Sequence, residues 1–245
     1  MIHSVQFRSF AAVLAIGASM AVVSQGDESP SCDVQRWEPA IAKFEKQDES
    51  DPPPKDAVLF VGSSSIVGWD VAKWFPDLPV INRGFGGSQL CHATHFVPRI
   101  VAKYQPRVIV LYSGDNDVAA GKPAERVHED FTSFVAAVRK SFPETPIVFI
   151  SIKPSIARWK LAESMRAANK LIEADCQAKD HLYFVDVWPT MLGDDGQPRK
   201  DIFRQDGLHM NDEGYKRWVD LLQPRLDSLL KNENHQGTKS TKDGD

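Results

Sequence analysis

The chain lacks the features that mark several large classes of protein. Lys and Arg number 29 against 33 Asp and Glu, a net charge of −4, so the positive excess typical of nucleic-acid binders is missing. Three cysteines are too few for a disulfide scaffold, and no Cys-x-x-Cys pair indicates a zinc site. No apolar run reaches the roughly 20 residues of a membrane-spanning helix. Instead, 245 residues that are 42% hydrophobic predict one sizeable globular core.

The N-terminus has the pattern of a secretory signal peptide. Residues 1–8 carry a single basic side chain, Arg8, and precede an apolar run over residues 9–24. A basic start, a short apolar stretch and small residues at a possible cleavage site predict a signal peptide over residues 1–26. An uncleaved membrane anchor is the alternative. We therefore expect a secreted or periplasmic protein with no stable membrane association after cleavage.

The cysteines leave two arrangements open. Cys32, Cys91 and Cys176 would lie in an oxidising compartment, where either one disulfide plus a free thiol or three buried thiols is expected. Cys91-His92 and His95 place two imidazoles at helical spacing. No nearby acid completes a metal shell, so we predict a structural role and no metal site.

The middle of the chain alternates between two kinds of apolar pattern. Short, nearly unbroken runs of β-branched and aromatic residues predict strands buried on both faces. These runs are residues 57–62, 79–84, 107–114, 146–152 and 182–187. Stretches with apolar residues at helical spacing predict helices. They are residues 33–47, 88–104, 123–141, 158–178 and 211–230, the last capped by Asn211.

Alternating strands and helices predict an α/β fold. We expect a single three-layer α/β/α sandwich with a five-stranded parallel sheet over residues 57–230. Residues 27–56 would form an N-terminal helix and a linker that the prolines of SDPPPKD break, and residues 231–245 a polar disordered tail. In such sheets the active site lies beyond the carboxyl ends of the strands, so the loops that begin at Gly62, Asn82 and Gly114 are the first candidates.

The loop after the first strand contains three consecutive serines. In Gly62-Ser63-Ser64-Ser65-Ile66, a hydroxyl at a strand-to-helix turn is exposed above a helix N-terminus, which favours developing negative charge. The alternative is a structural role in which one of these serines caps the next helix. Neither the Gly-x-Ser-x-Gly elbow of α/β-hydrolases nor a phosphate-binding Gly-Lys-Ser/Thr is present.

Two further loops supply groups that can donate hydrogen bonds. The glycines of Asn82-Arg83-Gly84-Phe85-Gly86-Gly87-Ser88 let the backbone approach a ligand, although a tight turn also explains them. A dinucleotide fingerprint would need glycine where Gln89 stands. In Ser113-Gly114-Asp115-Asn116-Asp117, the asparagine amide can donate to an oxyanion while the acids hold the turn.

Near the end of the chain, Asp206-Gly207-Leu208-His209 precedes the last predicted helix. A histidine that acts as a general base needs an acceptor for its second ring nitrogen, and an Asp three residues earlier can supply it. A lone Asp-x-x-His on a surface is usually without function.

Together the four loops resemble the SGNH (GDSL-type) serine hydrolase superfamily over roughly residues 57–230. This resemblance implies a flavodoxin-like fold. It implies Ser64 as the nucleophile, with Ser65 as the alternative, and Asp206 and His209 as acid and base. It also implies an oxyanion hole built from the Ser64 N–H, Gly87 and Asn116. Ser63 departs from the family's usual Gly-Asp-Ser, which has Asp at that position.

The resemblance implies a secreted carboxylic ester hydrolase that works through an acyl-enzyme and needs neither metal nor organic cofactor. We expect small acyl or acetyl esters as substrates, including esters of carbohydrates. A lysophospholipase or thioesterase, and a non-catalytic relative that binds a glycan or lipid in the same pocket, are the alternatives.

Four more residues are candidates for the substrate groove. Trp69 follows the serine turn, and Arg158 and Trp159 follow the fourth strand, although core packing explains the tryptophans equally well. Arg83 adjoins the glycine loop, where it would bind an anionic or sugar group or pair with Asp117.

Overall fold

The computed structural model describes Met1 and residues 32–237, with the backbone alone over residues 232–237. Residues 2–26 of the predicted signal peptide and residues 238–245 of the predicted tail lie outside this part of the chain. No helix within the described residues has the length and apolar character needed to cross a membrane.

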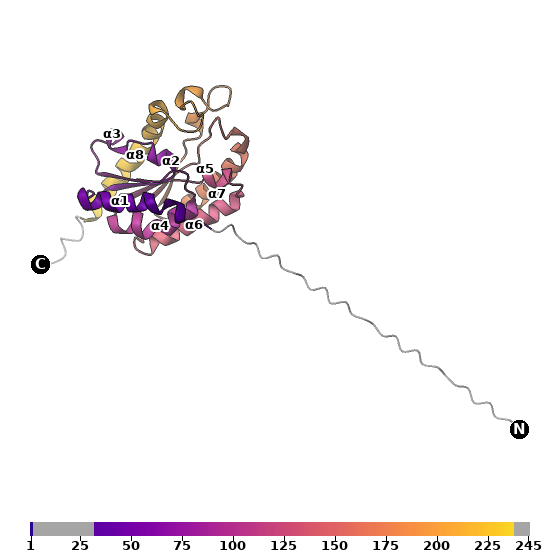
Figure 1. The fold of residues 1–245 in the computed structure, drawn as a ribbon, viewed down its shortest axis with the longest axis horizontal. Coiled ribbons are helices and arrows are strands. Elements are labelled where there is room, and N and C mark those ends of the chain that lie inside the picture. Colours follow the sequence, from indigo (N-terminus) through magenta and orange to yellow (C-terminus); the bar gives the residue numbers. More distant parts are fainter. Residues whose placement is uncertain (2–31, 238–245) are drawn as a thin grey trace. The chain divides into compact units, whose positions relative to one another are not determined.

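Residues 32–237 form one parallel sheet with helices on both faces, as predicted (Figure 1). The strands are β1 (Val58–Gly62), β2 (Val80–Gly84), β3 (Val108–Tyr112), β4 (Ile147–Ile150) and β5 (Leu182–Val185). Their order in the sheet is β2-β1-β3-β4-β5, the flavodoxin-like order. The chain therefore reverses its direction of winding beside β1, and ligand sites in such sheets lie at that point.

The helices form the two outer layers. The α-helices are α1 (Glu38–Ser50), α2 (Ser64–Val67), α3 (Val71–Trp74), α4 (Leu90–Ile100), α5 (Asp115–Ala119), α6 (Ala124–Arg139), α7 (Ala162–Ala178) and α8 (Asp212–Gly237). Single 3-10 turns are η1 (Gln35–Trp37), η2 (Ala102–Tyr104), η3 (Trp159–Leu161), η4 (Pro189–Met191) and η5 (Lys200–Ile202). The short helices α2, α3 and α5 have too few turns to show an apolar period, which is why sequence patterning misses them.

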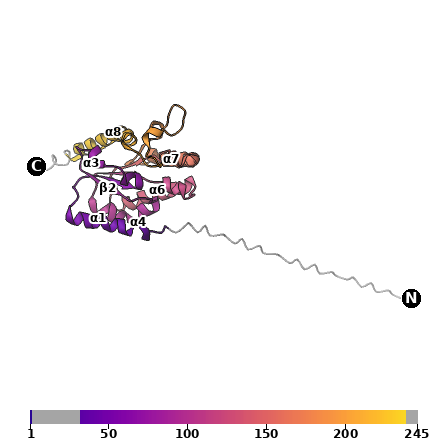
Figure 2. The ribbon, with the colours of Figure 1, turned by 45° about the horizontal axis from the view of Figure 1, so that its top comes forward.

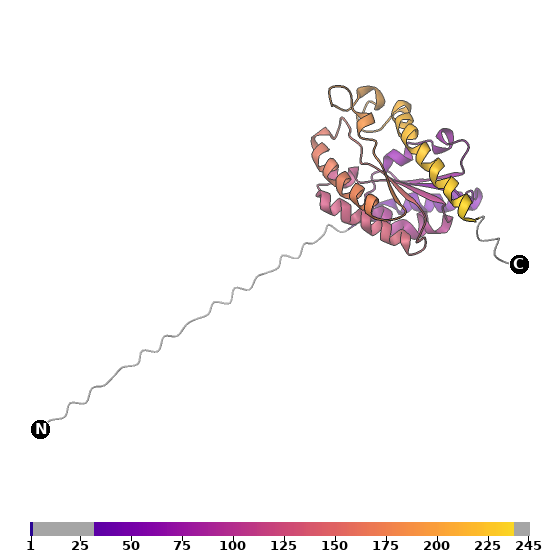
Figure 3. The ribbon, with the colours of Figure 1, turned by 180° about the vertical axis from the view of Figure 1, so that it is seen from behind.

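Alternation along the strands divides the core in two. In β1, Leu59 and Val61 pack with α1, α4, α6 and α7, whereas Val58 and Phe60 pack with α2, α3 and α8. Figure 2 shows α1, α4 and α6 on one side of the sheet and α3 and α8 on the other, and α8 crosses its face in Figure 3. Because both faces are covered, β1, β3, β4 and β5 are nearly continuous apolar runs, whereas β2, at the edge of the sheet, contains Asn82 and Arg83.

The last helix continues past its predicted end at residue 230. It runs to Gly237, so the part of the predicted tail over residues 231–237 is helical rather than disordered. Residues 225–236 contain no proline or glycine, and adding residues to a helix that packing has already formed costs less than starting a new one. At its start, the Asn211 side chain accepts a hydrogen bond from the Gly214 N–H at 3.1 Å, as expected of a cap.

Candidate active site

Ser64 occupies the first position of α2, directly after β1. The turn is abrupt because Gly62 adopts a φ of +150°, and a Cβ there would lie 1.9 Å from the Tyr112 carbonyl oxygen. Ser63 and Ser65 are buried, at 0% and 1% exposure, whereas Ser64 is partly exposed. Of the three serines, Ser64 is therefore the one that solvent reaches, which favours it over Ser63 and Ser65 as a candidate nucleophile.

The Ser64 hydroxyl lies in a hydrogen-bonded chain with His209 and Asp206. The distance from Ser64 Oγ to His209 Nε2 is 3.0 Å, and His209 Nδ1 is 2.6 Å from Asp206 Oδ2. These distances are within the range in which a base can take a proton from a serine. The structure thus brings together a serine and an Asp-His pair that are more than a hundred residues apart in sequence.

Asp206 is held as a carboxylate by its own turn. Its Oδ1 accepts hydrogen bonds from the Leu208 and His209 N–H groups, both at 2.9 Å. The hydrogen bond with His209, followed by these two, holds the pKa of the Asp206 carboxyl well below its usual range. The ionised carboxylate can therefore orient the imidazole and stabilise its protonated form.

The glycine loop approaches Ser64, and two backbone N–H groups of this region have no partner in the fold. Gly87, at φ +74°, is exposed, and the position of a Cβ on the preceding Gly86 would lie 4.0 Å from the Ser64 Cβ. Among the described residues, neither the Gly87 nor the Ser64 N–H donates a hydrogen bond within the protein. Free N–H groups beside a nucleophile are what an oxyanion hole requires.

The Asn116 amide is fixed in orientation from both sides. Its Nδ2 donates to the Ser88 carbonyl at 2.9 Å, and its Oδ1 accepts from Arg158 Nη2 at 2.9 Å. One amide hydrogen then remains for a ligand. Arg158 also donates a hydrogen bond to Asp115 at 3.0 Å, so it links two residues of α5, and its predicted place in the substrate groove stays a prediction. Its side chain is about 20% exposed.

A buried lysine next to this network had no signal in the sequence. Lys153 follows β4, is 1% exposed, and has its Nζ 3.9 Å from Asp115 Oδ2. Burial lowers its pKa, and the neighbouring Asp115 opposes that effect. The sequence did not predict the contact between Lys153 and Asp115, because that contact depends on how β3 and β4 pair.

Asp117 holds the third loop, as predicted, but with a different partner. It is fully buried and accepts hydrogen bonds from the Leu90 N–H at 3.2 Å and from Lys122 Nζ at 2.8 Å. Burial raises the pKa of its carboxyl, with Lys122 acting in the opposite direction. The bond to Leu90 ties the loop after β3 to the start of α4.

The predicted role of Arg83 is wrong. Arg83 neither lines the site nor pairs with Asp117; it is 6% exposed and forms an ion pair with Asp48 and a 2.6 Å hydrogen bond to Tyr104 Oη. The reason is that β2 is an edge strand covered by α1, which places Asp48 beside it. Its neighbour Asn82 instead supports the serine turn, donating to the Ile66 carbonyl at 2.7 Å and the Trp69 carbonyl at 3.0 Å.

The predicted groove role of Trp69 is also wrong. Its side chain is 1% exposed and packs in the core among the rings of Phe60, Phe75, Tyr215 and Trp218. The short helix α2 turns the chain back over the sheet, which carries Trp69 inward. This is the core-packing alternative that the sequence left open.

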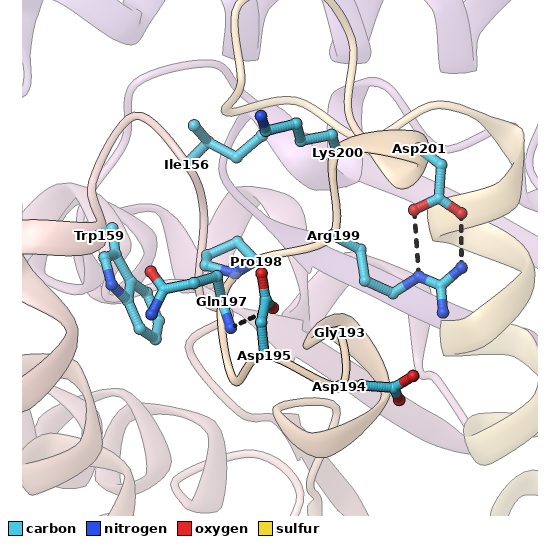
Figure 4. A pocket seen from close by; sticks show the side chains of 10 residues that line it. All are labelled: Ile156, Trp159, Gly193, Asp194, Asp195, Gln197, Pro198, Arg199, Lys200 and Asp201. Carbon is cyan, nitrogen blue, oxygen red and sulfur yellow. Dashed lines mark hydrogen bonds and ion pairs between the residues drawn. The ribbon is translucent and has the colours of Figure 1, made fainter.

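Trp159 lies at a pocket close to the Asp206–His209 turn. It is partly buried, 6.4 Å from the ring of Trp188, and the pocket has a volume of about 740 Å³. Ile156 and Trp159 come from the segment after β4, and the rest of the lining comes from residues 193–201 (Figure 4). The sequence offered no sign of this second segment.

The first described residues are tied to the glycine loop. Cys32 and Cys91 form a disulfide, and Trp37 Nε1 donates to the Gly86 carbonyl at 2.9 Å. His92 packs on the Trp37 ring at 3.9 Å, and burial lowers its pKa to about 4. His92 and the two sulfur atoms are near enough to hold a metal ion, but sulfurs joined to each other are not thiolate ligands.

Cys176 is the free, buried cysteine within residues 32–237. Burial raises the pKa of its thiol to about 12, so it packs as a small apolar side chain. Of the two arrangements open from sequence, the structure has one disulfide and one free thiol.

The chain was also compared with known proteins. The model of the GDSL-like Lipase/Acylhydrolase family matches residues 61–217, which span all four loops. No curated protein matches the chain.

Several solved structures share its fold. One from Streptococcus pneumonia, provisionally described as a platelet activating factor, has a TM-score of 0.70 and 21% identity, covering 79% of this chain and 94% of that one. A GDSL-like lipase from Bacteroides thetaiotaomicron has a TM-score of 0.65 and 19% identity, with coverages of 77% and 97%. A family 3 carbohydrate esterase from Clostridium thermocellum has a TM-score of 0.60 and 14% identity, with coverages of 73% and 98%.

Proposed function

The chain belongs to the GDSL-like lipase/acylhydrolase family, and we propose that it is a secreted serine esterase acting on small acyl or acetyl esters. The observation that carries the proposal is the hydrogen-bonded chain from Ser64 Oγ through His209 to Asp206. It lies where three loops at the carboxyl ends of neighbouring strands present unpaired donors.

In the first half of the reaction, Ser64 Oγ attacks the ester carbonyl carbon while His209 Nε2 takes its proton. The carbonyl oxygen becomes an oxyanion, which accepts hydrogen bonds from the Ser64 and Gly87 N–H groups and from Asn116 Nδ2. Asp206 stabilises the imidazolium. The protonated His209 then gives its proton to the alcohol oxygen, the ester bond breaks, and an acyl-Ser64 remains.

The second half repeats these steps with water. His209 takes a proton from a water molecule, whose oxygen attacks the acyl carbon. A second oxyanion forms in the same place and collapses, releasing the carboxylic acid and returning the proton to Ser64 Oγ. No step requires chemistry beyond these side chains and the backbone.

The proposal of secretion has two supports of different kinds. One is the signal-peptide pattern over residues 1–26. The other is the Cys32–Cys91 disulfide, because structural disulfides persist in oxidising compartments and are rare in reducing ones. Expression of the full chain and N-terminal sequencing of the exported product tests it, and retention of an intact N-terminus in the cytoplasm would contradict it.

The catalytic proposal is tested by labelling the purified protein with a fluorophosphonate and mapping the adduct by mass spectrometry. We expect one adduct, on Ser64, and turnover of p-nitrophenyl acetate that falls by at least about 10⁴-fold in Ser64→Ala. Ser65→Ala is the matched control, with labelling intact. A folded wild type that neither reacts nor turns over ester would favour the non-catalytic binding protein instead.

A further inference from the structure

Lys153 is a buried cation that the proposed reaction does not use. Its side chain is 1% exposed, and the residue lies just after β4, at the carboxyl end of the sheet. Among the described residues its Nζ makes no hydrogen bond, and the carboxylate that it approaches is Asp115, with Oδ2 at 3.9 Å. The rings of Tyr112 and Phe203 lie 5.9 and 6.0 Å from Nζ. Burying an ammonium in this way costs free energy, so its place beside a candidate active site points to a task for its charge.

The charges around Lys153 single out Asp115 as its main partner. Burial lowers the pKa of the ammonium, and Asp115 opposes that effect most strongly. Arg158 acts in the same direction as burial, because it is a second cation close by, and Asp206 acts in the direction of Asp115. Two cations and two carboxylates therefore influence one another here, and the contact between Lys153 and Asp115 is the one within 4 Å.

Arg158 divides its guanidinium between two neighbours. Its Nη1 donates to Asp115 Oδ2 at 3.0 Å, and its Nη2 donates to Asn116 Oδ1 at 2.9 Å. The other oxygen of Asp115, Oδ1, is buried and has no hydrogen-bond partner in the described part of the chain. A guanidinium and a carboxylate frequently form a bidentate pair with two parallel hydrogen bonds. Arg158 therefore has a competing arrangement, in which Nη2 leaves Asn116 and donates to Asp115 Oδ1.

The charge of Lys153 acts against this competing arrangement. Its Nζ approaches Oδ2 of Asp115, the same oxygen that Arg158 uses, and so balances part of the charge on the carboxylate. It also repels the guanidinium, since both groups are cations. Both effects weaken the attraction of Asp115 for Arg158, which favours the observed arrangement with Nη2 on Asn116.

We propose that Lys153 is a positioning residue of the oxyanion hole, which keeps Arg158 on Asn116 and thereby holds the Asn116 amide in the orientation that the oxyanion needs. It acts through Asp115 and Arg158 and contacts no reacting atom. The proposal rests on the esterase function, because the orientation of Asn116 affects a rate only if an oxyanion forms. The placement of Arg158 itself can be tested without any reaction.

Lys153→Met keeps the length of the side chain and removes its charge. We expect kcat for p-nitrophenyl acetate to fall about tenfold, with KM changed less than about twofold. Lys153→Gln should give the same fall, and its polar end group keeps the test open if the methionine variant does not fold. Lys43→Met, at an exposed lysine of α1, is the matched control and should keep the wild-type kcat. A folded, uncharged variant with wild-type kcat would overturn the proposal.

Double variants identify the residue through which Lys153 acts. In an Asn116→Ala background, Lys153→Met should lower kcat less than about twofold further, because the amide that it positions is gone. Losses that multiply would show that Lys153 acts on another part of the site and would contradict the proposal.

A second substitution should restore activity. Asp115→Asn added to Lys153→Met should recover part of the lost kcat, since a neutral amide attracts Arg158 less than a carboxylate does. A purely structural role of Lys153 predicts the opposite, a further loss, because the double variant removes one more group from the buried network.

Crystal structures of the wild type and of Lys153→Met test the placement of Arg158 without an ester. In the variant we expect Nη2 to leave Asn116 Oδ1 and to lie within hydrogen-bond distance of Asp115 Oδ1. If Arg158 keeps its place on Asn116, the proposal is wrong even where the wild type is an active esterase. If Arg158 moves and the wild type hydrolyses no ester, the placement by Lys153 is supported and the esterase function is the part that fails.

Discussion

The two halves of the candidate site are held by the chain in different ways. Ser64, Gly87 and Asn116 follow β1, β2 and β3, so the register of the sheet sets their mutual positions. Asp206 and His209 lie in a turn before α8, where their side chains are 48% and 32% exposed. The turn holds its own geometry through hydrogen bonds within four residues.

Because of this difference, substitutions in the two halves should have different effects on activity and stability. A change among the strand-borne groups disturbs buried hydrogen bonds and should lower activity and stability together. A change in the exposed turn should remove activity and leave the fold nearly intact, because exposed pairs contribute little to stability. Variants at Asp206, Asn116, Arg158 and the Cys32–Cys91 disulfide test this separation.

Asp206→Asn is expected to have the largest effect. The amide cannot hold the imidazole in the same tautomer or stabilise its charge, so kcat should fall by about 10⁴-fold. The melting temperature at neutral pH should fall only slightly. Ester hydrolysis and thermal unfolding of the same samples measure both, and a large loss of stability would show that the turn is not independent of the core.

The same variant has a defined pH dependence. The pKa of Asp206 is lower in the folded than in the unfolded chain, where Asp titrates near about 3.9. The carboxylate's contribution to stability is therefore present above about pH 4 and lost as the pH falls further. Melting temperatures of wild type and Asp206→Asn should differ most at neutral pH and converge in acid.

Asn116→Ala should lower activity and stability at once. Loss of one oxyanion donor reduces kcat by about 10²- to 10³-fold. The Ser88 carbonyl and one nitrogen of Arg158 also lose a partner, which costs about 1–3 kcal/mol of unfolding free energy. Denaturant unfolding and steady-state kinetics check both values. Unchanged stability would contradict the coupling argued for this half.

Arg158→Met should have a smaller effect, because Arg158 acts through Asn116. Without the hydrogen bond from Arg158 to its Oδ1, the Asn116 amide is oriented only by the Ser88 carbonyl. We therefore expect kcat to fall about tenfold with KM unchanged. Arg158→Lys should restore little of the lost activity. The planar guanidinium of arginine donates to Asp115 and Asn116 at once through two nitrogens, and a single ammonium group cannot reproduce that geometry. A change confined to KM would instead identify Arg158 as a substrate ligand.

Removal of the disulfide should affect the rate least. Cys32→Ser combined with Cys91→Ser opens a link across 59 residues of sequence and should cost about 2–4 kcal/mol of stability. Trp37 still packs beside the glycine loop, so kcat should stay within about threefold of wild type. In the unmodified protein, melting temperatures with and without a reductant measure the loss of stability. A large fall in kcat would show instead that the disulfide helps to position the glycine loop.

Sequence patterning predicted the strands and the long helices well, and it predicted the surroundings of individual side chains poorly. All five strands were predicted, and in β1, β3, β4 and β5 burial leaves a clear run of apolar, mostly β-branched and aromatic residues. Arg83 and Trp69 were misplaced because their environments depend on α1 and α8, which are distant in sequence. The loop over residues 193–201 carried no periodicity, so its pocket could not be foreseen.

By itself, the sequence determined the alternation of strands and helices and the four loops that carry the serine, the glycines, the asparagine and the Asp-His pair. These are local properties, since burial patterns and turns depend on residues that are close together in the sequence. Only the tertiary structure decided which of three serines is accessible, which cysteines pair, and that Arg158 holds Asn116. Those outcomes depend on distances between segments far apart in the chain, which packing of the sheet and its two helical layers fixes.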